Sequence, residues 1–345
     1  METGPLLSEK TATRDNNFDF LRFMAATQVI LYHTFALSGN YSGTLWNSYK
    51  RLLSDSGLGV SVFFIISGFL ILKSRMDSPG LLEYLKKRVL RIAPGLALAV
   101  AFCVLVVGPL TSSLGLHEYF TSLTGYRDHL PRVFEKNHIP YLVNGSLWTL
   151  KVEVFAYMII AALGFMRAAS LKMSLTLLVL LLVVIDAAFF IMPEYSGMKI
   201  GSIYANQSVR YLIFFMAGSM LYMYRDKVPL NGYLFSLLLL AFVVSQHTVY
   251  WHFVSFLALP YMVIYFAYSG PPFNRFGKYG DFSYGLYILA FPVQQTLLYY
   301  SGGRIGNATF LAAAFFITLA LAVISWNVVE KPALRLKKVQ LSPWH

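Results

Sequence analysis

The chain has 345 residues, of which 57% are hydrophobic and only 13% are charged, and its formal net charge is +12. A soluble domain carries about a quarter charged residues, which solvate its surface. This composition therefore excludes a soluble globular protein and indicates a polytopic membrane protein. The basic residues are scattered between apolar runs, which argues against a nucleic-acid-binding protein. A single cysteine, Cys103, excludes a disulfide framework and a multi-cysteine metal site.

Apolar runs along the whole chain predict membrane-spanning helices. A helix needs roughly 20 mainly apolar residues to cross a bilayer core, and about ten such runs occur. We therefore expect an all-α, polytopic membrane helix bundle. The expected spans are residues 17–38, 57–73, 92–111, 146–166, 173–192, 208–224, 229–247, 252–269, 282–300 and 308–329. The second run is short and Gly-rich, so a partly re-entrant or tilted helix is expected there.

The distribution of lysine and arginine predicts the topology. An even number of spans places both termini on one side, and most of the 28 basic residues fall on inner segments if the N-terminus is cytoplasmic. We expect a cytoplasmic segment at 1–16, a membrane domain at 17–330 and a basic cytoplasmic tail at 331–345. Two connections are long, an inner basic loop at 74–91 and an outer polar loop at 111–145. No cleavable signal peptide is expected.

Ionisable side chains inside the expected spans are candidates for function, because a membrane helix tolerates them only with a partner. Arg22 and His33 lie about three helical turns apart, so they share one face of the first span. Glu153 in the fourth span lies at a similar depth and could orient the His33 imidazole. The alternative is a structural histidine beside a snorkelling arginine. Asp186 and Arg210 lie near outer helix ends, where a structural ion pair is expected.

The densest basic cluster of the chain lies in the expected inner loop, at residues 86–91. Arg88 and Arg91 are three residues apart and share a helical face, with Lys87 beside them. A guanidinium fork matches phosphate oxygens, so one interpretation is a site for a phosphorylated cytosolic donor. The other interpretation is attraction to anionic lipid headgroups.

The remaining reactive side chains favour structural roles. Cys103 lies among apolar residues and is expected to serve packing. The outer-loop histidines His117, His129 and His138 lack the compact spacing of metal ligands, so no metal site is expected.

Six short segments follow one another along the chain. They are Asp19-Phe20-Leu21-Arg22 with Tyr32-His33, then Gly59 to Phe69, then Lys87-Arg88-Val89-Leu90-Arg91-Ile92-Ala93-Pro94, then Ser146-Leu147-Trp148 through Glu153, then Ser283-Tyr284-Gly285-Leu286-Tyr287, and finally Glu330-Lys331-Pro332. In this order they resemble the motifs of the acyltransferase family 3 membrane proteins, which O-acylate extracytoplasmic glycans in bacteria. The resemblance covers nearly the whole chain.

The resemblance implies an O-acyltransferase of the bacterial cytoplasmic (inner) membrane, surrounded by membrane lipids. An acyl-CoA, expected to be acetyl-CoA, would bind from the cytoplasm through Lys87, Arg88 and Arg91. The acceptor would be a hydroxyl of a surface or lipid-linked glycan, reached from outside. Acyl-CoA is then a substrate, and neither a bound cofactor nor a nucleic-acid partner is expected.

The resemblance also implies roles for individual residues. His33 would act as general base or as a transient acyl carrier. Glu153 would orient His33 or the acceptor, and Arg22 would hold the donor or pair with Asp19. Further motif positions are Ser67, Trp148 and Tyr284.

Two positions depart from the family pattern. Ser61 stands where many members have an acidic residue, and Ala290 stands where they have a histidine, so roles of those side chains are not carried over.

A transporter or flippase for a lipid-linked sugar or small polar solute would also use intramembrane His, Glu and Arg. A non-catalytic scaffold would explain the apolar spans but not the ordered motifs.

Overall fold

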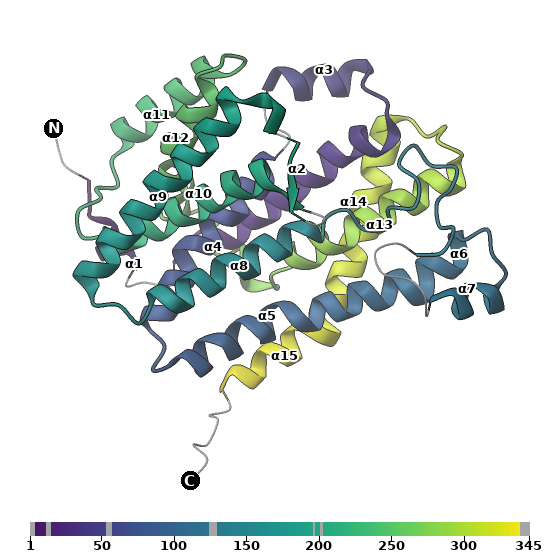
Figure 1. The fold of residues 1–345 in the computed structure, drawn as a ribbon, viewed down its shortest axis with the longest axis horizontal. Coiled ribbons are helices and arrows are strands. Elements are labelled where there is room, and N and C mark those ends of the chain that lie inside the picture. Colours follow the sequence, from purple (N-terminus) through teal and green to yellow (C-terminus); the bar gives the residue numbers. More distant parts are fainter. Residues whose placement is uncertain are drawn as a thin grey trace, which may run out of the picture. The chain divides into compact units, whose positions relative to one another are not determined.

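The computed structural model describes residues 4–11, 15–52, 57–123, 130–195, 197–200 and 203–338. In this part of the chain nearly every element is a helix (Figure 1). His129 and the tail residues 339–345, which belong to predicted features, lie outside the described residues.

A helix coincides with each predicted apolar run. These helices are α2 (Phe18–Ser38), α4 (Leu58–Met76), α5 (Leu81–Phe102), α8 (Trp148–Leu163), α9 (Ala168–Ile191), α10 (Ala205–Met223), α11 (Gly232–Ser245), α12 (Trp251–Ala267), α13 (Ser283–Ser301) and α14 (Asn307–Ser325). Two π-helical segments, η1 (Cys103–Val107) and η5 (Trp326–Glu330), continue α5 and α14 into α6 (Gly108–Thr111) and α15 (Lys331–Arg335).

Shorter elements connect these helices. They are α1 (Leu7–Thr11), α3 (Gly43–Leu52), α7 (Leu116–Ser122), η3 (Pro193–Tyr195), η4 (Phe276–Lys278), η6 (Leu336–Lys338) and a small hairpin of β1 (Lys199–Ile200) with β2 (Ile203–Tyr204).

Several helices of the described residues are long and apolar enough to cross a membrane. They are Phe18–Ser38, Leu58–Met76, Leu81–Thr111, Ala168–Ile191 and Asn307–Arg335. The chain is therefore a membrane protein. The larger number of predicted spans and the cytoplasmic location of both termini stay predictions.

The run at 57–73 is one uninterrupted helix that reaches Met76, and its expected re-entrant or tilted course in the membrane stays a prediction. One detail between the predicted second and third spans is wrong. The expected inner loop at 74–91 is mostly helical, because α4 ends at Met76 and α5 begins at Leu81. Lysine, arginine and leucine are good helix formers, so the basic motif continues the third span as a helix rather than leaving it as a loop.

By its internal packing the chain divides into two compact units. The first consists of Met1–Ala25, Gly57–Tyr84 and Trp148–Tyr279. The second consists of Ala26–Ser56, Leu85–Leu147 and Gly280–His345.

In the first unit α4 and α10 lie side by side at very close range (Figure 1). A Cβ atom on Gly68 would lie 1.8 Å from the Phe215 carbonyl oxygen, and one on Gly218 would lie 2.1 Å from that of Ile65. Small residues let membrane helices approach in this way, since their backbones can then touch. The Ser219 hydroxyl adds a hydrogen bond to the Gly68 carbonyl at 2.9 Å. This reciprocal glycine contact fixes the rotation of α4.

In the second unit α13 packs on α14, where a Cβ on Gly285 would lie 2.9 Å from Ala322. The fully buried Gln294 of α13 donates hydrogen bonds to the Ile30 carbonyl at 3.0 Å and to Thr34 at 3.3 Å on α2.

Described residues of the predicted outer loop at 111–145, although the loop is mostly polar, contribute side chains to a buried apolar cluster. The cluster contains Cys103, Val107, Tyr119, Val133, Phe134 and Val143. The packing role expected for Cys103 is therefore confirmed, since only 7% of the residue is exposed.

Candidate active site

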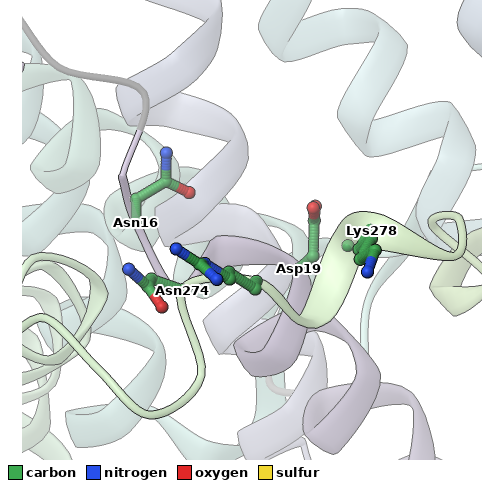
Figure 2. Close-up of a pocket in the computed structure, with 6 residues that line it drawn as sticks. Asn16, Asp19, Asn274 and Lys278 are labelled. Atoms are coloured by element: carbon green, nitrogen blue, oxygen red, sulfur yellow. The ribbon is translucent and has the colours of Figure 1, made fainter.

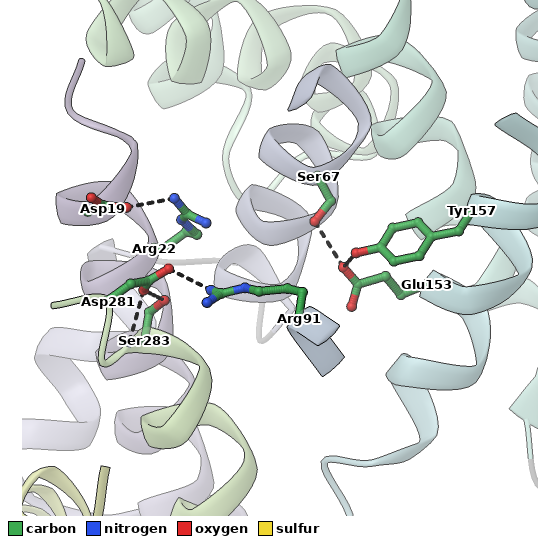
Figure 3. Close-up of polar contacts among 8 residues, drawn as sticks. All are labelled: Asp19, Arg22, Ser67, Arg91, Glu153, Tyr157, Asp281 and Ser283. Carbon is green, nitrogen blue, oxygen red and sulfur yellow. Dashed lines mark hydrogen bonds and ion pairs between the residues drawn. The ribbon is translucent and has the colours of Figure 1, made fainter. Parts of the chain in front are cut away.

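A carboxylate held by two hydroxyl groups lies in the first unit. Glu153 on α8 accepts a hydrogen bond from the Ser67 hydroxyl of α4 at 3.0 Å and another from the Tyr157 hydroxyl one turn further along α8. Both bonds end on Oε1, and Figure 3 shows Oε2 pointing away from both donors. Glu153 therefore has a fixed orientation, and its Oε2 atom accepts neither of these two hydrogen bonds.

The local packing explains why Glu153 and Ser67 meet. Ser67 directly precedes Gly68, whose contact with α10 sets the face that α4 presents. At the start of α8 the Trp148 ring packs against Tyr211 with ring centroids 5.8 Å apart, and Tyr211 stacks on Phe64 of α4 at 5.1 Å. The motif positions Ser67, Trp148 and Glu153 therefore form one packed arrangement.

The first turn of α2 contains an ion pair. Arg22 donates to the Asp19 carboxylate at 2.6 Å, three residues back on the same helix (Figure 3). Arg22 is 21% exposed and Asp19 37% exposed, so the pair lies at a partly open position. Two roles were expected for Arg22, binding of the donor or pairing with Asp19. The structure contains the pair with Asp19.

His33 lies on the part of α2 that belongs to the second unit. Its ring packs edge-on against Phe291 of α13, with centroids 5.2 Å apart and planes at 81°. Gly145 accommodates the Phe291 ring, because a Cβ there would lie 2.6 Å from it. Within the described residues the buried Nδ1 of His33 has no hydrogen-bond partner. Phe291 thus fixes the ring plane while leaving this nitrogen without a protein partner.

The predicted pairing of His33 with Glu153 stays a prediction. Glu153 belongs to the first unit and His33 to the second. Each is held by its own contacts, Glu153 by Ser67 and Tyr157 and His33 by Phe291.

The basic motif and the last two motifs come together in the second unit. Arg91 donates to Asp281 at 2.5 Å (Figure 3), and its guanidinium lies 5.8 Å from the centre of the Tyr284 ring. Tyr284 donates to the Ile92 carbonyl at 2.9 Å. Asp281 in turn accepts hydrogen bonds from the backbone and hydroxyl of Ser283, which orders the start of α13. Arg91 therefore positions α13 in addition to any contact with a donor.

Asp281 was not identified as a site residue from the sequence, although an Asp two residues before a helical Ser is a recognisable helix-start signal.

Glu330, from the closing motif, is 2% exposed and accepts a hydrogen bond from Ser325 at 2.7 Å. A Cβ on Gly95 of α5 would lie 2.6 Å from Tyr284 and 3.5 Å from the Glu330 carboxyl carbon. Because Gly95 has no side chain, Tyr284 and the Glu330 carboxyl group can both pack closely against α5.

Lys337 of η6 lies close enough to the basic motif of α5 to interact with its charges. It follows α15, which lies beside α5 (Figure 1). Burial and, to a smaller extent, the positive charges of Arg88, Arg91 and Lys87 together lower the pKa of Lys337 to about 8. These cations create a region of positive potential suited to an anion.

Two other predicted features have clear positions. Asp186 of α9 pairs with Nε2 of His252 on α12 at 2.5 Å, and the Arg210 guanidinium lies 5.2 Å from the Trp251 ring centre. Asp186 is thus a paired structural carboxylate, with His252 as the partner that the sequence did not identify. Among the described residues no group of three or more His, Cys, Asp and Glu side chains is placed to hold a metal ion.

Comparison with known proteins identifies the family. The family model described as an acyltransferase domain matches residues 15–327, and the chain therefore belongs to this acyltransferase family 3. The chain is 28% identical to an O-acetyl transferase of Shigella phage Sf6, over 95% of this chain and 99% of that protein. It is also 28% identical to Nodulation protein 10 of Rhizobium leguminosarum bv. viciae, over 96% of each chain.

A more distant similarity covers only part of the chain. Regulator of hypoxia-inducible factor 1 of Caenorhabditis elegans is 27% identical over 45% of this chain and 34% of that protein. No solved structure matches the chain. Together the family and its full-length relatives make this protein a membrane-embedded O-acyltransferase, and they favour the enzyme over the transporter and the scaffold.

Proposed function

We propose that the protein transfers an acetyl group from cytoplasmic acetyl-CoA to a hydroxyl of an extracytoplasmic glycan, in the bacterial inner membrane. The O-acetyl transferase among the full-length relatives supports acetyl as the transferred group. The observation that carries the chemistry is the His33 imidazole, whose ring plane is fixed by Phe291 and whose Nδ1 has no protein partner in the described part of the chain.

In this proposal His33 acts as general base. It accepts the proton of the acceptor hydroxyl while the hydroxyl oxygen attacks the thioester carbonyl carbon. The new C–O ester bond forms, the C–S bond breaks, and the proton passes from His33 to the leaving thiolate of coenzyme A. The alternative is a covalent acetyl-imidazole on His33, which the acceptor hydroxyl then opens.

Glu153 would bind a hydroxyl or an imidazole N–H through Oε2, since Ser67 and Tyr157 already hold Oε1. A fixed carboxylate stabilises the positive charge that develops on an imidazole or the dipole of a hydroxyl donor. Arg22, oriented by Asp19, would contribute a positive charge near the donor.

The cations of α5 and of η6 would hold the pyrophosphate group of the donor. Arg88 and Arg91 supply guanidinium donors for phosphate oxygens, and Lys87 and Lys337 add to the positive potential. Because Arg91 also pairs with Asp281, its replacement should loosen the start of α13 as well as weaken donor binding.

Incubation of the purified protein in lipid nanodiscs with acetyl-labelled acetyl-CoA and a glycan acceptor tests the proposal. We expect labelled ester in the glycan and stoichiometric release of free coenzyme A. The Arg88→Ala variant should raise KM for acetyl-CoA with the acceptor KM unchanged. Absence of labelled ester, together with movement of an unmodified solute across the membrane of sealed proteoliposomes, would contradict the proposal. Labelled protein that forms on the way to product, and that is missing in the His33→Ala variant, would identify His33 as an acyl carrier.

A further inference from the structure

A polar pocket opens beside the first turn of α2, within the first unit. It has a volume of about 460 Å³ and is lined by Asn16, Asp19, Asn274, Arg275, Gly277 and Lys278 (Figure 2). Pockets for organic ligands typically have volumes of about 300–1,000 Å³. None of the roles assigned above uses Arg275, Lys278 or either asparagine.

The pocket is built from two segments that lie far apart in the sequence and are firmly joined. Asn17 donates side-chain hydrogen bonds to the Phe266 carbonyl at 2.9 Å and the Gly270 carbonyl at 3.0 Å. The Phe20 ring stacks on Phe273 with centroids 3.9 Å apart and planes at 8°. Phe276 packs on the other edge of Phe20 at 5.5 Å. The walls are therefore held in place before a ligand arrives, which reduces the entropy lost on binding.

The charge of the lining favours an anion. Arg275 and Lys278 have exposed side chains at the pocket, and the Asp19 carboxylate is neutralised by Arg22 at 2.6 Å. Two cations that face the same cavity bind phosphate oxygens through charge-assisted hydrogen bonds. The amides of Asn16 and Asn274 add donors and acceptors that suit ribose hydroxyls or the edge of a base.

An exposed aromatic ring adjoins the cationic side. Tyr279 is 77% exposed, and the Lys278 ammonium lies 5.7 Å from the centre of its ring. A tyrosine face stacks well on a nucleobase, and such stacking strengthens binding considerably. Cations, amides and a stacking ring in one place are the chemistry that recognises a phosphorylated nucleoside.

We infer that this pocket binds the nucleotide end of the acyl-CoA donor, its phosphoadenosine, through Arg275, Lys278 and Tyr279. This inference rests on the proposed use of acyl-CoA. It assigns to the 274–279 segment a substrate-binding role separate from the basic motif of α5, and separate from the atoms that react.

Nucleotide binding tests the inference directly. Purified full-length protein should bind adenosine 3′,5′-bisphosphate, and the Arg275→Ala/Lys278→Ala double variant should bind it at least about tenfold more weakly, because two charged hydrogen-bond donors are lost. Tyr279→Ala should also weaken binding. Lys227→Ala, which removes an exposed lysine of the same unit, is the matched control and should bind as the wild type does. All of these side chains are exposed, so the variants should fold.

Kinetics with two donors separates this site from the reaction itself. The double variant should raise KM for acetyl-CoA about tenfold, while KM for S-acetylpantetheine, which lacks the nucleotide, and kcat for either donor should match the wild type. Wild-type protein that fails to bind the nucleotide, or a double variant that binds it normally, would overturn the inference. If the double variant loses nucleotide binding but wild-type protein transfers no acetyl group from acetyl-CoA, the proposed function fails and the nucleotide site stands.

Discussion

At the scale of single residues, His33 is the group on which the proposed chemistry depends. His33→Ala should slow acetyl transfer by roughly 10²- to 10⁴-fold, the usual effect of losing a general base. The variant should still insert and fold, because the hydrogen bonds of Gln294 to Ile30 and Thr34 hold α13 on α2 without His33. Product formation at saturating donor is the measurement, and His117→Ala, at an exposed histidine of α7, is the control. A well-folded His33→Ala protein with near-normal turnover would remove His33 from the mechanism.

The charge of Glu153 can be separated from its shape. In Glu153→Gln the amide oxygen can still accept the hydrogen bonds of Ser67 and Tyr157, so the packing of α8 on α4 should survive. Loss of the negative charge should lower kcat roughly 10- to 100-fold. Melting temperature and activity measured together decide the outcome. A variant that does not accumulate would make Glu153 a structural partner of α4 instead.

Lys337 gives the donor site a pH dependence. Its pKa of about 8 lies below its ordinary value, so the folded protein loses this proton at a lower pH than the unfolded chain does. The depressed pKa means that the proton opposes folding, and the stability of the folded state should rise as pH increases through and above 8. The positive charge that attracts donor phosphates is lost over the same range. KM for acetyl-CoA should therefore increase as pH rises above about 8.

The matched variant is Lys337→Arg, because a guanidinium stays protonated throughout this range. It should flatten the dependence of KM on pH near 8. If KM of the wild type and of Lys337→Arg follow the same pH curve, Lys337 does not contribute to donor binding.

At the scale of elements, the closest helix contact supports the site. Gly68→Ala would place a Cβ 1.8 Å from the Phe215 carbonyl oxygen, so α4 and α10 would have to separate. Forcing extra atoms into packed helices costs about 1–3 kcal/mol. We expect a lower melting temperature together with reduced kcat, since Ser67 would leave Glu153. Gly80→Ala, where a Cβ meets nothing within 4 Å, is the control. Equal melting temperatures for the two variants would contradict the close contact.

The elements also show what one sequence can predict. The apolar runs located each long helix, because burial in lipid requires an uninterrupted stretch of apolar residues. Hydropathy started the third span at residue 92 and so did not reveal that the basic motif at 86–91 is part of α5, although the spacing of Arg88 and Arg91 favoured a helix. The Arg91–Asp281 pair and the Gly68–Gly218 contact join residues far apart in the chain. Such contacts depend on which helices are neighbours, and the hydropathy and motif pattern along one sequence does not reveal that.

At the scale of the whole molecule, the mechanism requires that donor and acceptor reach the protein from opposite sides of the membrane. The excess of basic residues on the inner segments predicts that the connection between α4 and α5 is cytoplasmic and that α7 is outside. Asp77 and Glu118 are exposed in these two places, so cysteines introduced there report the location of each. Cys103 must first be replaced with alanine, although its thiol is buried.

A thiol reagent that cannot cross the membrane should label Glu118→Cys in intact cells and should spare Asp77→Cys until the cells are opened. The labelling after lysis shows that both cysteines are reactive, so protection in intact cells reports sidedness alone. Because α4 to α7 are consecutive, the reverse pattern would invert this part of the chain and place the basic motif of α5 outside, away from cytosolic acyl-CoA. Labelling of both cysteines in intact cells would mean that the number of spans between α4 and α7 is even, and the donor would then have to reach Arg88 from the same side as the acceptor.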